Sequence, residues 1–391
     1  MTIGGTVTLE ALERDPYPIY TRLRDEEPVS FVPAVGLWLV TRHDDVKRVT
    51  NDPETFTAAT EPSTLNRTMG KNMLGMEGPE QRWIRAITES PFRPRDVEER
   101  TQGMIPRLAD ELIDGFVERG QADLFHEYAD PMSVRSLCFM LGLDEVPWQD
   151  ILRWNEGLMP GLANFEGDPA KQAPADEASA ALHAAIGGVL DQLADEPDGS
   201  VLSWMLHHEQ DGRRMSREQI VANTTLMLSG GLQEPRDVIA LTLWALLSNR
   251  SQFQEVREDR SLVKAAVEET LRWAGPVGTA TRQATREVSL SGVELERGAL
   301  IGAVLSSANR DPRRWTDPDR FDVHRKEGAH LAFSAGTHFC LGAWFGRHLA
   351  RVTLDHALDR LFDLELVPER PVTLSGWEFR APDSLWVRWA V

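Results

Sequence analysis

One short segment constrains this chain more than any other, because it sets a cysteine between two glycines. Residues 333–342 read FSAGTHFCLG, so Cys340 follows Gly336 and precedes Gly342. A helix start supplies free N–H groups and a positive dipole end, which stabilise the thiolate that binds metals. Gly336 permits a tight turn, and Gly342 lets the backbone approach a flat ring. The segment favours a thiolate ligand for a haem iron, although a buried structural cysteine remains an alternative.

The segment resembles the cysteine loop of the cytochrome P450 family. The pattern of that loop is Phe-x-x-Gly-x-x-x-Cys-x-Gly, and this chain meets all four fixed positions. The resemblance extends over essentially the whole chain. It implies a haem-thiolate monooxygenase with haem b as cofactor and Cys340 as the iron ligand. A thiolate ligand donates electron density that favours O–O cleavage.

Composition limits the protein class. The 391 residues are enough for a large core, and no linker divides them. Two cysteines argue against a disulfide framework, and a formal charge of -19 argues against nucleic acid as a general partner. The N-terminus lacks a signal-peptide pattern, and no apolar run is long enough for a membrane span. We therefore expect a soluble, cytoplasmic protein.

The coarse pattern is mainly α with a smaller β part, which is an α+β class and fits the P450 fold. We expect one P450 domain over residues 1–391. Its helix-rich part covers about 77–273, and its β-rich segments cover about 28–56, 285–305 and 371–390.

Three local expectations follow from the same pattern. Residues 54–76 lack a clear period, which predicts a long loop. Residues 167–176 contain Pro169 and Pro174, which predicts a connection between two helices. Residues 217–248 predict one long helix, kinked where Pro235 interrupts its interior.

The resemblance assigns further residues to the haem and to a structural brace. Haem propionates need cationic or hydrogen-bonding partners, and Arg85, Arg282 and His338 stand at the matching positions. The family often has histidine where this chain has Gln81. The other assignment is a brace of the cysteine loop, for which the matching residues are Glu269, Arg272 and Arg325. The alternative for each of these charges is a solvated surface position.

The central helix departs from the family pattern. Where the family usually has Ala-Gly-x-(Asp/Glu)-Thr, this chain has Gln233 at the acid position and Glu234 at the alcohol position, followed by Pro235. A carboxylate can accept and return a proton, as a general acid–base does. We hypothesise that Glu234 delivers protons and lets hydrogen peroxide support turnover. The alternative is that Glu234 points away and caps a local network.

The Gln-Glu-Pro sequence also resembles the bacterial aromatic O-demethylases of this family, which act on methoxyphenols. That subgroup closes its pocket with phenylalanines, which here match Phe379, Met69 and Ala163. Replacing phenylalanine by a flexible methionine and by alanine frees volume and favours a dimethoxyphenol such as syringol over guaiacol. Gly230 would lie beside this pocket, and Thr279 would hydrogen-bond a phenol or face solvent.

The resemblance thus implies oxidative O-demethylation of a small aromatic substrate with release of formaldehyde, using dioxygen or hydrogen peroxide. Electrons would come from a separate reductase or ferredoxin, for which Arg347 and Arg351 offer a docking patch or are plain solvated charges. Three alternatives remain open. They are hydroxylation of a terpene, fatty acid or polyketide, a haem sensor without turnover, and a haem-free scaffold.

Overall fold

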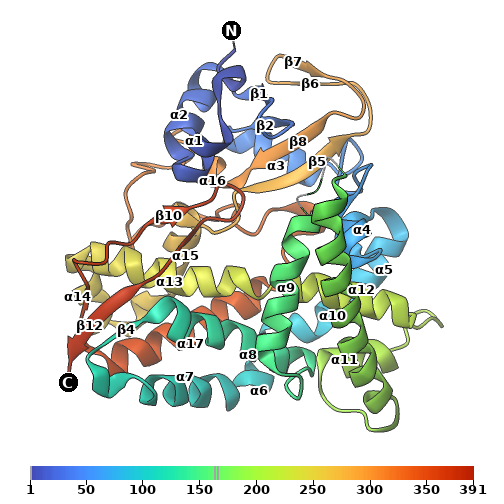
Figure 1. The fold of residues 1–391 in the computed structure, drawn as a ribbon. Helices are drawn as coiled ribbons and strands as arrows, with labels where there is room; N and C mark the ends of the chain where they lie inside the picture. The colour runs from blue at the N-terminus through green and yellow to red at the C-terminus, as the bar shows by residue number, and fades with distance from the viewer. Residues whose placement is uncertain (1, 163, 165–166) are drawn as a thin grey trace.

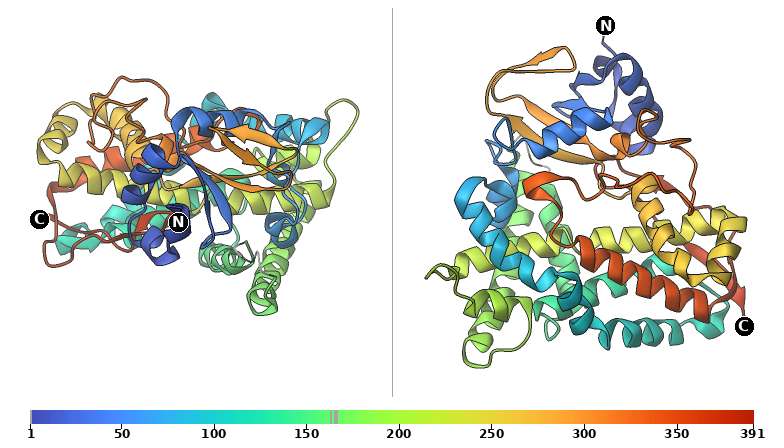
Figure 2. Two further views of the ribbon diagram at one scale, coloured as in Figure 1. Left: turned by 90° about the horizontal axis from the view of Figure 1, so that it is seen from above. Right: turned by 180° about the vertical axis from the view of Figure 1, so that it is seen from behind.

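The computed structural model describes residues 2–162, 164 and 167–391 (Figure 1). Helices make up most of it, and a five-stranded sheet gathers with α1 and α2 at one end of the molecule, as the view from behind also shows (Figure 2). The prediction of a mainly α fold with a smaller β part is confirmed. None of the helices in the described ranges combines the length and apolar character that a bilayer span requires.

The α-helices have these bounds: α1 Leu9–Arg14, α2 Tyr17–Glu26, α3 His43–Asn51, α4 Thr64–Met69, α5 Gly78–Glu89, α6 Pro94–Thr101, α7 Met104–Asp114, α8 Asp130–Leu141, α9 Trp148–Leu162, α10 Pro169–Asp195, α11 Val201–His207, α12 Arg217–Ser229, α13 Gln233–Ser248, α14 Arg250–Glu258, α15 Val263–Ala274, α16 Leu305–Ala308 and α17 Ala343–Arg360.

The strands have these bounds: β1 Val29–Val32, β2 Leu37–Val40, β3 Phe56–Thr57, β4 Gln121–Asp123, β5 Thr279–Ala284, β6 Val288–Leu290, β7 Val293–Leu295, β8 Leu300–Val304, β9 Phe362–Leu366, β10 Leu374–Ser375, β11 Ala381–Pro382 and β12 Trp386–Ala390. The five-stranded sheet has the order β1-β2-β8-β5-β3, so strands within residues 29–57 lie beside strands within residues 279–304. Strand β5 begins at Thr279, before the predicted start of the second β-rich segment at 285.

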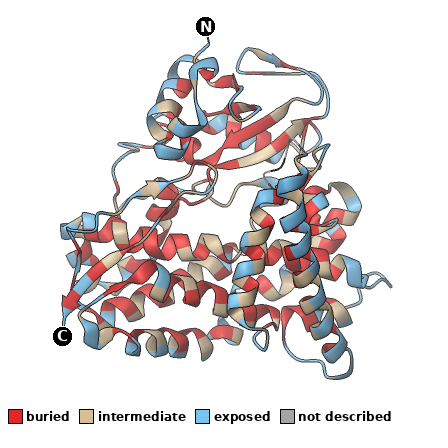
Figure 3. Cartoon of the chain, viewed as in Figure 1, coloured by how far each residue is buried: buried red, intermediate tan, exposed pale blue. Residues whose placement is uncertain are grey.

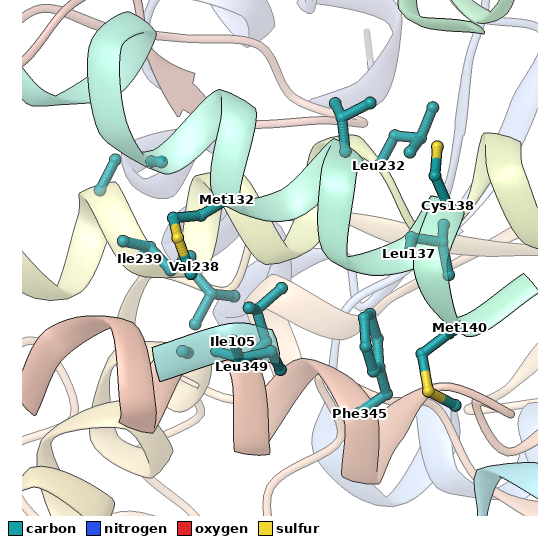
Figure 4. Packing of buried hydrophobic residues seen from close by; sticks show 14 of the residues in the cluster. Ile105, Met132, Leu137, Cys138, Met140, Leu232, Val238, Ile239, Phe345 and Leu349 are labelled. Atoms are coloured by element: carbon teal, nitrogen blue, oxygen red, sulfur yellow. The ribbon is translucent and has the colours of Figure 1, made fainter. Parts of the chain in front are cut away.

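The largest apolar core lies among the helices. Figure 4 shows Met132 from α8, Val238 from α13 and Leu349 from α17 converging on one another. Most of α13 is buried between these neighbours and α15 (Figure 3). A charged side chain in the interior of α13 is therefore held away from water, and its burial is costly unless it has a partner. Only the start of the helix is an exception.

The structure corrects the single kinked helix predicted over 217–248. It has two helices, because α12 ends at Ser229 and α13 begins at Gln233. Pro235 lies in the first turn of α13, where its missing N–H leaves no hydrogen bond unmade. The chain therefore breaks at 230–232, before the proline, and the expected interior kink is wrong.

Two smaller expectations also differ from the structure. The predicted connection at 167–176 is shorter, because α10 begins at Pro169 and contains Pro174. Extensive packing of α10 along α9 outweighs the one backbone bond that Pro174 removes. The predicted loop at 54–76 contains the helix α4. Ser63 caps the start of this helix, because its side chain accepts a hydrogen bond from the backbone N–H of Asn66.

Candidate active site

The cysteine loop is built around backbone contacts that require glycine. The N–H of Cys340 donates to the carbonyl of Phe333 at 3.0 Å, which closes the loop. Gly336 has a φ of +71°, and a Cβ there would lie 2.6 Å from the carbonyl oxygen of Thr50. A side chain at this position would be strained and would collide with backbone. The loop is therefore specified by local geometry as well as by its cysteine.

Cys340 lies two residues before Gly342, which is the N-cap of α17. Cys340 is partly accessible, and desolvation by the surrounding protein raises the pKa of its thiol to about 11, while the N–H of Gly342 acts to lower it by donating to the sulfur. A metal cation that coordinates a thiol deprotonates it outright. Cys340 is therefore a neutral thiol by itself and becomes an anion when it ligates a metal.

Three features test whether the surroundings fit a haem. No described atom would lie within 4 Å of a Cβ on Gly342, so there is room for a flat ring beside the cysteine. Arg282 is only 4% exposed, and its guanidinium donates solely to the carbonyl of Thr281 among the residues described. Gln81 is buried, and its Oε1 has no partner within the described ranges. A buried unpaired cation and a buried amide suit an anionic cofactor, so these residues fit the group.

The other two predicted propionate partners already have carboxylate partners. His338 Nε2 lies 2.9 Å from Glu77 Oε1, and Arg85 Nε lies 2.9 Å from Glu89 Oε2. Burial acts to raise the pKa of Glu77, but hydrogen bonds from His338 and from the backbone of Ala58 hold that pKa below its usual value. Sequence reasoning missed Glu77, whose role depends on a contact across 261 residues.

The predicted brace comes together as one buried cluster. Glu269 accepts two hydrogen bonds from Arg272, each 2.8 Å long, and Arg325 Nε lies 3.2 Å from the same carboxylate. Arg272 also donates to the backbone carbonyls of Asn309, Pro318 and Arg320. The cluster therefore ties α15 to the chain before the cysteine loop.

A second carboxylate next to it was not predicted. Glu268 accepts from Arg347 at 2.9 Å and lies 3.1 Å from His330, so it joins α15 to α17 across the cysteine loop. Burial acts to raise the pKa of Glu268, but these two partners outweigh it and hold that pKa at about 2. The guanidinium of Arg347 also stacks 4.3 Å from the ring of Phe333. Arg347 is therefore neither a plain solvated charge nor free for docking.

Glu234 occupies the first turn of α13, immediately after the helix break. The residue is partly buried, yet its Oε2 atom is sealed from solvent and has no hydrogen-bond partner in the described part of the chain. Burial raises the pKa of Glu234 to about 7. Its negative charge would also raise the pKa of Cys340, so the two groups lie within electrostatic reach of each other. Gln233 opens the same helix, and no hydrogen bond of its side chain to a described residue is seen.

Two further acids flank this point. Arg236 donates to Asp237 at 2.9 Å and reaches Asp130 at 3.5 Å, while its guanidinium stacks 4.5 Å from the ring of Phe125. Burial raises the pKa of Asp237 to about 6 despite the adjacent arginine. Glu234 thus belongs to an acidic group in which only it lacks a cationic partner among the described side chains.

The structure does not bring all the predicted substrate residues together around one cavity. Met69 is buried at the end of α4, and Gly230 caps α12. Thr279 is buried and donates to Glu378 at 2.8 Å, so it does not face solvent. Phe379 is half exposed and lines an open cleft of about 440 Å³ with Phe125 and Arg236. Ala163 lies outside the described residues.

Known proteins are similar to this chain in both sequence and fold. A sequence model of the family described as Cytochrome P450 matches residues 189–378. Cytochrome P450 107B1 of Saccharopolyspora erythraea is 31% identical and aligns over 94% of this chain and 93% of its own length. The Steroid C26-monooxygenase of Mycolicibacterium smegmatis is 32% identical over 94% of this chain and 90% of its own. The solved structure of CYP109Q5 from Chondromyces apiculatus superposes with a TM-score of 0.88 at 28% identity, covering 100% of this chain and 98% of that one.

Proposed function

The chain belongs to the cytochrome P450 family of haem b monooxygenases, and from that premise we propose that it demethylates a small methoxy-substituted phenol. The substrate would be of the syringol or guaiacol type, and the products would be a phenol and formaldehyde. Oxidation of the methoxy carbon gives a hemiacetal, which breaks its C–O bond to release both products. With dioxygen the reaction consumes two electrons and two protons and forms water. With hydrogen peroxide as oxidant it needs no external electrons.

One observation carries the proposal, and it is the unpartnered carboxyl of Glu234 at the break before α13. With a pKa of about 7, this group can both hold and release a proton near neutral pH. Haem, when bound, supplies the oxidising chemistry of the reaction. We assign Glu234 to moving protons to and from the oxidant, with Gln233 beside it. This assignment also makes peroxide a competent oxidant.

The remaining residues bind and orient. Cys340 would ligate the iron, and Arg282 would hold a propionate with Gln81 as a neutral neighbour. Arg85 and His338 would bind the propionates through the donors that their pairs with Glu89 and Glu77 leave free. Met69 and Gly230 would bound a small apolar pocket for the aromatic ring. The methionine in place of an aromatic ring leaves space for a second methoxy group, so we favour syringol over guaiacol. We also propose that residues 1–391 form one domain and that a separate reductase or ferredoxin supplies the electrons.

The role of Glu234 is tested with peroxide as the sole oxidant. Glu234→Thr should lower peroxide-driven demethylation about a hundredfold or more, because general acid–base groups typically contribute factors of that size. The isosteric Glu234→Gln keeps the volume and removes the proton, so it should behave alike. Glu258→Gln, which removes an exposed carboxylate on α14, is the control and should leave the peroxide-driven rate unchanged. Unchanged peroxide-driven rates in both Glu234 variants would refute the proposal.

The substrate class is tested separately. Methoxyphenols should shift the haem absorbance on binding, and one formaldehyde should form for each phenol produced. The competing candidate is hydroxylation of a larger substrate. The activities of similar proteins favour it, among them the Steroid C26-monooxygenase and the Vitamin D(3) 25-hydroxylase of Pseudonocardia autotrophica. A panel of methoxyphenols, sterols and macrolides separates the two. Oxygen consumption without any product would indicate a sensor or an uncoupled protein instead.

A further inference from the structure

A second cleft lies away from the cysteine loop, among α1, α13, α15 and β10. Its volume is about 280 Å³. Strand β10 contacts α1, and in the view of Figure 1 both are drawn above α13 and α15. Such a volume lies at the lower end of the range for small-molecule sites, so it suits a ligand with one ring. Neither Glu234 nor Cys340 lines this cleft.

The inner walls are aromatic and apolar. The indole rings of Trp244 on α13 and Trp273 on α15 stack 5.5 Å apart and 19° from parallel, and both residues line the cleft. The guanidinium of Arg310 lies 5.0 Å from the centre of the Trp273 ring. Leu241 and Ala274 complete this side. Flat aromatic surfaces of this kind favour a planar aromatic guest over an aliphatic one.

The rim is cationic. Arg14, Arg310 and Arg380 line the cleft together with one acid, Asp15, so guanidinium groups outnumber carboxylates in the lining itself. Asp319, outside the lining, pairs with Arg310 at 3.3 Å, and no such pair of Arg14 or Arg380 is seen with a described residue. Guanidinium groups are the residues of choice for binding carboxylates in a planar, bidentate manner. The charge therefore selects an anion.

The three guanidiniums still have hydrogen bonds to give. No side-chain hydrogen bond or ion pair of Arg14 is seen with any described residue. Arg310 stacks 3.5 Å from the ring centre of Tyr17 and donates through Nε and Nη1, while its Nη2 meets no acceptor in the described ranges. The Nε of Arg380 is buried without a described partner. A buried unpaired donor is costly, and an anionic ligand would satisfy it.

We propose that this cleft binds a monocyclic aromatic carboxylate. Its ring would lie against Trp244 and Trp273, and its carboxylate would face the guanidiniums of Arg14, Arg310 and Arg380. The proposal does not rest on O-demethylation, because the site is separate from Glu234 and the cysteine loop.

The probe is benzoate, measured by calorimetry on the haem-loaded protein, with the neutral isostere benzamide beside it. Benzoate should bind once per chain, and benzamide should bind about tenfold more weakly or not at all, because it lacks the charge that strengthens the hydrogen bonds. Benzoate should quench tryptophan fluorescence, and Trp244→Phe should reduce that quenching. The haem absorbance should not change over the same titration.

Arg14→Gln is the decisive variant, because this exposed side chain supports no described contact and its loss leaves the fold intact. It should weaken benzoate binding about tenfold. Arg297→Gln is the matched control, since Arg297 is exposed and lies outside the cleft. Three results would each overturn the proposal: no saturable binding, equal affinity in the two variants, or a haem absorbance shift that follows the heat of binding.

Discussion

Two partly buried glutamates of this site, Glu268 and Glu234, have opposite surroundings. Glu268 accepts hydrogen bonds from Arg347 and pairs with His330, and its pKa lies at about 2. Glu234 has an oxygen with no described partner, and its pKa lies at about 7. Near neutral pH the carboxyl of Glu268 therefore stays ionised, whereas that of Glu234 can bind and release a proton.

The difference separates the structural part of the site from its reactive part. Around the cysteine loop, each carboxylate of the brace is saturated with donors, which fixes the geometry of the loop. At the start of α13 the donors are missing, so the acid keeps its capacity to exchange a proton. A buried polar group without a partner is costly, and such groups cluster where function requires them.

The strongest way to break the comparison is to remove its centre. Cys340→Ala should abolish turnover with either oxidant, because no other described side chain takes the place of the thiolate. The reduced, carbon monoxide-bound protein should lose the Soret band position that thiolate ligation gives. Cys138→Ala, which alters the other cysteine in the core, is the control and should keep that band. Thiolate-type absorbance in Cys340→Ala would contradict the assignment.

The next largest effect is expected in the brace. Glu269→Gln leaves Arg272 buried without its anion, which costs about 3–5 kcal/mol in such pairs. The midpoint of urea unfolding should fall accordingly, whereas the exposed Glu258→Gln should leave it nearly unchanged. A small loss in Glu269→Gln would mean that Arg325 and the backbone carbonyls hold α15 without it.

The pH dependence of stability sharpens the contrast between the two acids. The pKa of Glu234 is raised by folding, so its stabilising contribution is complete below about pH 4.5 and is lost as the pH rises through 7. The pKa of Glu268 is lowered, so its contribution is present above about pH 4.5 and is lost as the pH falls towards 2. Urea unfolding of each Gln variant from pH 4 to pH 8 measures both.

Glu234→Gln should therefore gain stability at pH 8 relative to wild type, by up to about 3 kcal/mol, and should gain little at pH 4. Glu268→Gln should lose stability at pH 8 and lose less at pH 4. Parallel curves for the two variants would show that the surroundings of the two acids do not differ as described.

The smallest effect concerns the docking of an electron donor. Arg351 on α17 has no described ion-pair partner, unlike Arg347, so it remains available to a partner protein. Arg351→Gln should weaken partner-driven turnover at low salt by less than about 1 kcal/mol in apparent affinity and leave peroxide-driven turnover unchanged. An equal loss in both assays would place Arg351 in the fold rather than in the docking surface.

The sequence predicts those features whose cause is local. The spacing of Gly336 and Cys340 predicts the cysteine loop. Glu269 and Arg272 are three residues apart, which predicts that they lie on one face of a helix. The salt bridge of Glu268 with Arg347 could not be predicted, since the two residues are 79 positions apart and nothing in either segment marks the contact. Pro235 correctly indicates that the helix is interrupted nearby, but not where. The interruption comes before the proline, because a proline fits a helix start better than its interior.

The break at 230–232 also has a mechanical consequence. The segment before it, α12, packs on α4, α10 and α11, whereas α13 packs on α8, α15 and α17. The sequence predicts one continuous helix, but α12 and α13 are two helices that meet at the break and pack against different neighbours. We expect α12 to shift when substrates of different size bind, while α13 keeps its position relative to the cysteine loop.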